Sequence, residues 1–355
     1  MLKVGIFAPY VRSEITLAAV QIADWLVRCG IEVVFLAEGR ISSGIHPVWD
    51  RKVRRASRKS VYRWAAGATH LCWFSPNPEA MEAARLVASH SPRRTTKHIF
   101  FPHWSNWKAE HEALMRTADR TICLSYDMAQ WLDHRYSKAD SNRTWASLTA
   151  PASLLFPRNG RLSLVSTHLL VILTKSIELD MGITLLQIFD FLLDGHPGLH
   201  VTFLLEHSLP KCYRQELRRI SQSYTGRVVT VTSPAYYDYI QLARRHDWVY
   251  LTSTRHAYGS LLALLASSSV PVICHDMPPA RGHIIHNYNG KLIPCDLRES
   301  PAPVADVPLD EIGLALDKIL IGPEVLLRSM QSNTVIQLQQ KQKSFEQFLF
   351  KEFVQ

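Results

Sequence analysis

The chain has 355 residues, of which 47% are hydrophobic, and its formal net charge at pH 7 is +9. This length suits two domains better than one, and the hydrophobic content is sufficient for a core in each. No uncharged apolar run reaches about 18 residues, which argues against a transmembrane helix. The six cysteines are scattered without a Cys-x-x-Cys pair, which argues against disulfides and zinc and for a cytoplasmic protein.

In the first half, short apolar runs alternate with helical patterns. The first run, at residues 3–9, is too short for a signal peptide and is typical of a strand. A helical pattern at 14–29 ends before Gly30, and a second apolar run follows at 31–37. Three further runs lie at 70–75, 98–102 and 121–125. Strands that alternate with helices predict a parallel sheet with helices on both faces.

The excess positive charge is concentrated at residues 51–63, which include seven basic residues and no acidic one. Subtracting these seven leaves a net charge of only +2 for the rest of the chain. Apolar residues such as Val53, Val61 and Trp64 recur at helical spacing, which predicts an amphipathic helix with its basic residues on the opposite face. The charge therefore indicates that a polyanionic partner would meet this basic segment rather than the protein at large.

Three interpretations of the basic segment stay open. It can be a solvated helix face without any partner. It can be a helix on an anionic membrane surface, with Tyr62 and Trp64 at the interface. It can also contact the phosphates of a nucleic acid. The residues expected to contact the acceptor or polyanion are Arg54, Arg55 and Arg58.

The second half repeats the alternation after a region at 137–161 that lacks periodicity and predicts a linker. Strands are expected at 168–174, 200–205 and 227–231, and helices at 183–193, 212–221 and 236–244. The last stretch is helical by composition. We therefore expect a first domain at 1–150, a second at 151–322 and a C-terminal helix at 323–355.

Residues 248–295 carry the most informative pattern in the chain. A short apolar strand at 248–252 is followed by a polar loop and by a helix that opens at Gly259. A second buried strand at 270–274 leads to Asn289-Gly290. In α/β proteins, phosphate groups are held where the carboxyl end of a parallel strand leads through a loop into a helix.

The order of residues in this segment resembles the nucleotide-sugar half of GT-B glycosyltransferases of the large retaining type, similar to glycosyltransferase family 4. That family shows Pro-Ser, a charged residue, Glu-Gly-Phe-Gly, a helix with a second Glu, Gly-x-Pro-Val and Asn-Gly. The matching positions here are Thr252-Ser253, Arg255, 256–259, 270–272 and Asn289-Gly290. The two glutamates fall on His256 and Leu264, so the family's Glu-x7-Glu motif is degenerate.

The resemblance implies a GT-B fold, in which two Rossmann-like α/β domains face each other across a cleft and the last helix crosses back to the first domain. It also implies sugar transfer from a nucleotide-diphosphate sugar, held by the second domain, without a metal or other cofactor. We expect the acceptor to be a lipid-linked or lipopolysaccharide-type glycan, met peripherally at the inner membrane surface. One alternative is a phage-type enzyme acting on DNA with hydroxymethylated bases. Another is an inactive GT-B protein that binds a partner.

The nucleotide diphosphate requires positive charge and free backbone N–H groups. Lys175 and Arg255 can supply the charge, and a plain surface charge is the alternative for Arg255. His256 can form a hydrogen bond with a sugar hydroxyl or a phosphate, whereas Leu264 cannot bind a ribose diol. The candidate donor-binding residues are Lys175, Arg255, His256, Gly259, Ser260 and Arg281.

Two residues of the first domain are catalytic candidates. His103 follows a predicted strand, where the family often has a histidine that faces the sugar, and a packed core histidine is the alternative. Glu14 follows Ser13, a favourable N-cap, and an acid in the first turn of a helix is stabilising. Glu14 would instead be the base that deprotonates the acceptor hydroxyl if the enzyme inverts the sugar carbon. Retention and inversion both stay open.

Overall fold

The structure is a computed structural model, and it describes residues 2–11, 13–65, 67–74, 96–103, 109–136, 143–146, 166–174, 179–205, 209–232, 238–253, 259–298, 304–306, 308–322 and 324–354. The chain divides into two compact units. The first consists of Met1–Pro151, Gly259–Leu261 and Gln340–Gln355. The second consists of Ala152–Tyr258 and Leu262–Gln339.

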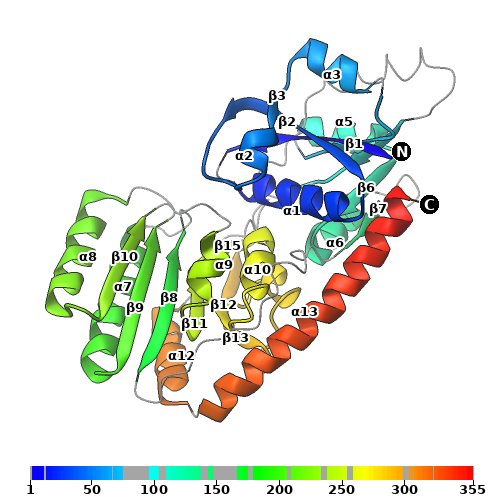
Figure 1. The fold of residues 1–355 in the computed structure, drawn as a ribbon. Helices are drawn as coiled ribbons and strands as arrows, with labels where there is room; N and C mark the ends of the chain where they lie inside the picture. The colour runs from blue at the N-terminus through cyan, green and yellow to red at the C-terminus, as the bar shows by residue number, and fades with distance from the viewer. Residues whose placement is uncertain are drawn as a thin grey trace. The chain divides into compact units, whose positions relative to one another are not determined.

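A seven-stranded sheet with the order β3-β2-β1-β4-β5-β6-β7 forms the centre of the first unit (Figure 1). All neighbouring strands are parallel, as the alternation of strands and helices predicted. The strands are β1 (Lys3–Tyr10), β2 (Glu32–Ile41), β3 (Arg54–Arg55), β4 (His70–Trp73), β5 (Lys97–Phe100), β6 (Arg120–Cys123) and β7 (Arg143–Trp145). The three-residue β7 lies within the predicted linker and is too short for periodicity to reveal.

In the described part of the first unit, the helices are α1 (Glu14–Arg28), α2 (Trp49–Lys52), α3 (Arg58–Ala65), α5 (Ala109–Thr117) and α6 (Tyr126–Arg135). The 30-residue α13 (Glu324–Phe353) also ends in this unit. Its Phe345 lies edge-on to Trp25 of α1, with ring centroids 5.8 Å apart. The buried Glu352 forms an ion pair of 3.2 Å with Arg120 at the start of β6. An aromatic contact and a buried carboxylate therefore hold the last turns of α13 on the first unit.

The basic segment does not form the single helix that its spacing predicts. The chain leaves α2 after Lys52, and Arg54 and Arg55 then pair with β2 as the edge strand β3. A new helix, α3, follows Ser57, whose hydroxyl accepts a hydrogen bond from the amide of Ser60 at 3.2 Å. The prediction was wrong because hydrogen bonding to the open edge of β2 and a cap at Ser57 outweigh helical periodicity in this segment.

A six-stranded sheet with the order β10-β9-β8-β11-β12-β13 forms the centre of the second unit (Figure 1). Its neighbouring strands are all parallel. They are β8 (Thr167–Leu173), β9 (Leu199–Leu205), β10 (Val228–Thr232), β11 (Trp248–Leu251), β12 (Val272–His275) and β13 (Gly290–Ile293). A separate antiparallel pair consists of β14 (Asp296–Arg298) and β15 (Val304–Asp306).

Among the described residues, the helices of the second unit are α7 (Leu179–Gly195), α8 (Lys211–Ser223), α9 (Asp238–Ala243), α11 (Pro278–Arg281), α12 (Leu309–Ile321) and the first part of α13. The helix α10 (Gly259–Ala266) also belongs to it from Leu262 onward, whereas Gly259–Leu261 group with the first unit. The core joins one face of the sheet to apolar residues of α7 and α12, including Phe189 and Leu316. Strands buried in this way are near-continuous apolar runs, which is why the sequence located them. Within the described ranges, no helix has the length and apolar character needed to cross a membrane.

Candidate active site

The strand order of each sheet reverses direction at one point. In the first unit the chain winds outward from β1 to β3 and then returns to add β4 on the other side of β1. In the second unit the reversal lies between β8 and β11. Doubly wound sheets bind ligands outside the carboxyl ends of the strands at such a switch point. The topology therefore indicates one candidate ligand site at β1/β4 and another at β8/β11.

Thr252 joins the two strand ends at the second of these points. Its hydroxyl donates a hydrogen bond to the carbonyl of Ile172 in β8 at 2.8 Å. The same oxygen accepts the amide of Thr174, just beyond β8, at 3.4 Å. Because Thr252 is buried, these bonds are shielded from water and hold the ends of β8 and β11 together.

His275 extends this arrangement to the next strand and was not singled out from the sequence. Its Nδ1 lies 2.8 Å from the carbonyl oxygen of Ser253, and its Nε2 lies 3.1 Å from the hydroxyl of Tyr250. A carbonyl can only accept, so Nδ1 carries the proton and Nε2 accepts from the tyrosine. Burial lowers the pKa of His275 to about 4, against the opposing effect of the Ser253 carbonyl, so the ring is neutral at pH 7. A buried neutral histidine thus fixes the backbone from which the loop after β11 departs.

The donor-binding residues predicted from the sequence fall partly within the described chain. Lys175, Arg255 and His256 lie outside the described residues. Gly259 and Ser260 are the first two residues of α10. Arg281 ends α11, where its guanidinium binds both carboxylate oxygens of Asp276, at 2.7 and 3.2 Å.

Leu264 has a purely structural position. Its side chain is only 2% exposed in α10. The position at which the family has its second glutamate is therefore buried in the core of this protein, as expected for an apolar leucine side chain.

The Asn289-Gly290 motif has a structural role at the opposite, amino edge of the second sheet. The side-chain oxygen of Asn289 accepts the amide of Ile285 at 2.6 Å, and its amide nitrogen donates to the carbonyl of His283 at 3.0 Å. Gly290 opposes Val272 at the first position of β13. A Cβ atom on Gly290 would overlap the carbonyl oxygen of Val272. The motif therefore shapes the turn into β13 and lies away from the carboxyl ends.

The carboxyl edge of the first sheet contains both catalytic candidates. Glu14 is the first residue of α1, just after β1, and Ser13 caps the helix by accepting the amide of Thr16, as predicted. The Glu14 side chain lies outside the described part.

His103 follows β5 and is half-buried. Burial and the nearby His111 lower the pKa of His103 to about 4, so this histidine is uncharged at pH 7. β4 alone separates β1 from β5, so these strand ends lie about 10 Å apart.

A hydrogen-bonded loop at the same edge was also missed from the sequence. One carboxylate oxygen of Asp50 accepts the hydroxyl of Tyr10 at 2.8 Å and the amides of Ile45 and His46 at 3.3 and 3.0 Å. The other accepts the amide of Gly44 at 2.6 Å. Burial raises the pKa of Asp50, but these hydrogen bonds outweigh burial and lower it overall. Asp50 thereby anchors the loop after β2 to the end of β1.

The basic segment presents its charges to solvent. Arg54 and Arg55 on β3 are exposed, and the Arg58 side chain lies outside the described part. Trp64 packs against the core of the first unit, with Lys3 Nζ 3.9 Å above its ring. The exposed basic side chains that form no ion pair with any described residue are Arg51, Lys52, Arg54, Arg55, Lys59 and Arg63. A charged edge strand also prevents pairing with other sheets, so this surface has a structural use as well.

Solved structures share this fold over the whole chain. A glycosyltransferase from Rickettsia africae ESF-5 has a TM-score of 0.70 at 10% identity, covering 99% of this chain and 98% of that chain. An alpha-glucosyltransferase in complex with UDP-glucose and DNA containing an abasic site has a TM-score of 0.65 at 11% identity, with 100% of both chains covered. Sucrose-phosphate synthase from Thermosynechococcus elongatus gives the same values.

No family model matches the chain, and no curated protein is significantly similar to it in sequence. Structural similarity at such low identity establishes the fold. The two parallel-sheet α/β units and their structural neighbours have the GT-B fold that the sequence predicted. Membership of family 4 stays a prediction.

Proposed function

We propose that this protein is a glycosyltransferase that moves a sugar from a nucleotide-diphosphate sugar to an acceptor hydroxyl. The observation that carries the proposal is the β8/β11 switch point of the second sheet, where Thr252 joins the strand ends and the loop after β11 leads into α10. Ligands bind at such a point in doubly wound sheets. The start of a helix presents backbone N–H groups that can bind an anion.

Each predicted residue has a role in this proposal. Lys175 and Arg255, which follow β8 and β11, neutralise the diphosphate, and the amides of Gly259 and Ser260 donate to it. His256 contacts the donor. Arg281 would contribute only after releasing Asp276, because its guanidinium is already engaged.

In the first domain, His103 would form a hydrogen bond with a sugar hydroxyl, because a neutral imidazole both donates and accepts. It would supply no charge to the phosphates. Glu14 would act as the acceptor base in an inverting reaction, which requires a carboxylate near the end of β1.

Binding of a nucleotide diphosphate is the first prediction. UDP or GDP should raise the melting temperature, because a ligand at 100 times its Kd stabilises the folded state by about 2.7 kcal/mol. Arg255→Ala should weaken this binding tenfold or more. Arg245→Ala is the matched control, because Arg245 is an exposed arginine that precedes the same strand at its amino end. If UDP, GDP, ADP and dTDP all leave the melting temperature unchanged, the donor site is wrongly assigned. Nucleotide binding without sugar release from any donor would favour an inactive binding protein.

A second prediction concerns His275 as a positioning residue. His275→Phe removes the ring nitrogens that hold Ser253 and Tyr250, and leaving two buried polar groups unpaired costs about 1–3 kcal/mol each. Because Ser253 precedes the loop with Arg255, UDP affinity should also fall by roughly tenfold. Tyr250→Phe is the control, since it loses the same hydrogen bond to Nε2 but leaves Ser253 held. We expect Tyr250→Phe to lower stability by about 1 kcal/mol and to preserve UDP affinity, measured by calorimetry. Equal losses of affinity in the two variants would mean that His275 is only structural.

For the acceptor, we propose a lipid-linked or lipopolysaccharide-type glycan, with the basic segment attracted to an anionic membrane surface. The unpaired, exposed basic residues of the segment support this proposal. Because Trp64 packs against the core, the attraction would be electrostatic and would not depend on inserting that side chain. Each basic residue near an anionic surface contributes about 1 kcal/mol.

DNA is a second candidate acceptor, and a specific observation favours it. One of the similar solved structures is an alpha-glucosyltransferase in complex with DNA. The same exposed arginines would contact phosphates in this case.

The third prediction separates the two acceptors. If the acceptor is DNA, the logarithm of the Kd for duplex DNA should rise steeply with the logarithm of the salt concentration. Replacing Arg54, Arg55 and Arg58 by alanine should lower the slope of this plot by about 2.7, because each lost phosphate contact removes about 0.9. The matched control replaces Lys211, Arg214 and Arg218 on α8, three exposed basic residues with the same total charge. In the glycan-lipid case, vesicles with phosphatidylserine should sediment the protein, vesicles of phosphatidylcholine alone should not, and DNA binding should be as weak in the wild type as in the triple variant. If neither DNA nor anionic vesicles bind, the basic segment is a solvated edge.

A further inference from the structure

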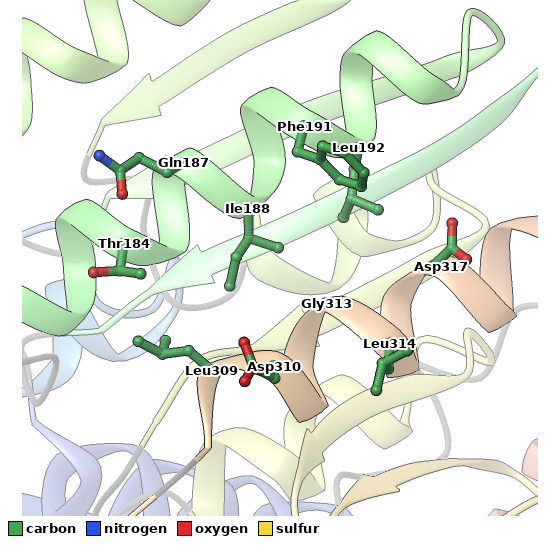
Figure 2. A pocket seen from close by; sticks show the side chains of 10 residues that line it. All are labelled: Thr184, Gln187, Ile188, Phe191, Leu192, Leu309, Asp310, Gly313, Leu314 and Asp317. Carbon is green, nitrogen blue, oxygen red and sulfur yellow. The ribbon is translucent and has the colours of Figure 1, made fainter.

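A groove of about 460 Å³ runs between α7 and α12 in the second unit (Figure 2). α7 contributes Ile188, Phe191 and Leu192 to its lining, and α12 contributes Leu314. This volume is typical of binding pockets, which range over about 300–1,000 Å³. The groove follows the flanks of two helices and not the carboxyl ends of the strands. The proposed donor site therefore does not account for it.

Large apolar side chains at the groove are exposed to solvent. Phe191 is 76% exposed and Leu314 is 52% exposed, although both belong to helices that bury their other faces in the core. Exposed aromatic and aliphatic side chains beside a concave surface are typical of a protein interaction site, and aromatic residues dominate the binding energy of such sites. Covering Phe191 and Leu314 would remove apolar surface from water, which favours association.

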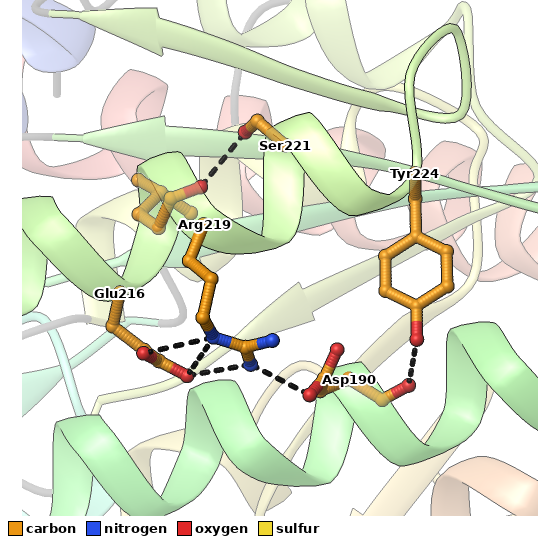
Figure 3. Close-up of polar contacts among 6 residues, drawn as sticks. Asp190, Glu216, Arg219, Ser221 and Tyr224 are labelled. Atoms are coloured by element: carbon orange, nitrogen blue, oxygen red, sulfur yellow. Dashed lines mark hydrogen bonds and ion pairs between the residues drawn. The ribbon is translucent and has the colours of Figure 1, made fainter.

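The charged residues that line the groove are both acidic, Asp310 and Asp317. The Asp310 carboxylate has no hydrogen-bond or ion-pair partner among the described residues. Asp317 lies 2.8 Å from Nε2 of His196. By contrast, Asp190 on α7 is already neutralised by Arg219 of α8 at 2.6 Å (Figure 3). The groove therefore offers an unpaired carboxylate beside its apolar floor, in a protein whose net charge is +9.

The dimensions of the groove match a short stretch of helix. Thr184 and Phe191, which both line the groove from α7, are seven residues apart. At a rise of about 1.5 Å per residue this corresponds to about 10.5 Å, or two turns. Asp310 and Asp317 are also seven residues apart on α12, so the two carboxylates lie along the same face of that helix.

We propose that the α7–α12 groove docks a basic amphipathic helix of a partner protein. The partner would insert apolar side chains at positions i, i+3 or i+4, and i+7 between Ile188, Phe191 and Leu314, as in other helix-in-groove complexes. A basic residue at one end would pair with Asp310, and one two turns away would approach Asp317. This inference does not depend on sugar transfer, because none of these residues belongs to the proposed donor site.

The test uses a fluorescein-labelled, 18-residue amphipathic peptide of leucine and lysine, and the same peptide with glutamate in place of lysine. In fluorescence anisotropy, the full-length protein should bind the lysine peptide and not the glutamate peptide. Phe191→Ala and Asp310→Lys should each weaken binding tenfold or more. Gly313→Leu should also weaken peptide binding, because the leucine side chain would fill the groove. It should leave α12 undistorted, because a Cβ at this position would make only an ordinary contact of 3.8 Å with Ile188.

Two matched controls make the result specific. Glu311→Lys makes the same charge change in the same helical turn as Asp310→Lys, but Glu311 does not line the groove. Phe350→Ala removes an exposed phenylalanine of the first unit. Both should keep the affinity within twofold. The proposal is overturned if the lysine peptide does not bind, if both peptides bind equally, or if the groove variants retain affinity. It is also overturned if the wild type is a dimer in sedimentation and Phe191→Ala makes it monomeric, because the groove would then be covered by a second copy of the chain.

Discussion

Replacing Gly290 by alanine is expected to destabilise the second unit by about 3 kcal/mol or more, at the upper end of the cost of overpacking. A Cβ at this position would overlap the carbonyl oxygen of Val272, and it would lie 3.3 Å from the carbonyl carbon and 2.9 Å from Ile284 Cγ2. A flexible side chain could move away, but the carbonyl belongs to the backbone of β12 and is fixed by the sheet. Urea unfolding, followed by far-UV circular dichroism, measures the effect as a lower midpoint.

The control for this substitution is Gly195→Ala at the last position of α7. No atom lies within 4 Å of a Cβ built on Gly195, and its φ is not positive. Alanine there should be neutral or stabilising by up to about 1 kcal/mol, because it restricts the unfolded chain and favours the helix. Hydrogen exchange should place the loss caused by Gly290→Ala in β12 and β13. An unchanged unfolding midpoint for Gly290→Ala would show that the sheet can open enough to accept a methyl group.

The sheets could be predicted from the sequence because buried parallel strands are continuous apolar runs. The runs at 168–174 and 270–274 overlap β8 and β12, with boundaries that differ by one or two residues. Two errors have local physical causes. β7 has only three residues and pairs with β6. A strand this short shows no periodicity in the sequence, so it could not be predicted. Residues 51–64 have helical spacing, but Arg54 and Arg55 pair with β2.

The candidate site could be predicted only where its residues form a local pattern. The polar loop before Gly259 follows a strand and precedes a helix, and this order is visible in the sequence. His275 and Asp50 were missed because a key side-chain partner of each is distant along the chain, although the three backbone amides that Asp50 accepts lie only four to six residues before it. His275 binds Tyr250, 25 residues earlier, and Asp50 binds Tyr10, 40 residues earlier. The one local signal for His275 is a histidine that ends a buried apolar strand, where an unpaired polar side chain would be costly.

Replacing Asp50 by alanine should destabilise the first unit by about 3 kcal/mol or more, because a carboxylate hydrogen bond contributes about 1.5–3 kcal/mol and the bonds are not additive. The substitution leaves the hydroxyl of the fully buried Tyr10 without its acceptor. It also removes the acceptor of the Gly44, Ile45 and His46 amides. The urea midpoint at pH 7 measures the loss. Asp238→Ala, at an exposed aspartate in the first turn of α9, is the control and should cost less than about 1 kcal/mol.

The effect of Asp50 should also depend on pH, with a definite sign. The hydrogen bonds lower the pKa of Asp50 in the folded protein below its unfolded value, which is about 3.9 for an aspartate. The carboxylate therefore contributes its full stability above that value and loses it as the pH falls through the folded pKa. The difference in urea midpoint between wild type and Asp50→Ala should be constant from pH 7 to 5 and should narrow at pH 3. A difference that stays constant down to pH 3, or widens, would mean that the ionised carboxylate does not hold the loop. Because this loop lies at the carboxyl edge of the first sheet, bonded to the end of β1, Asp50→Ala should also lower transfer to the acceptor while leaving UDP affinity unchanged.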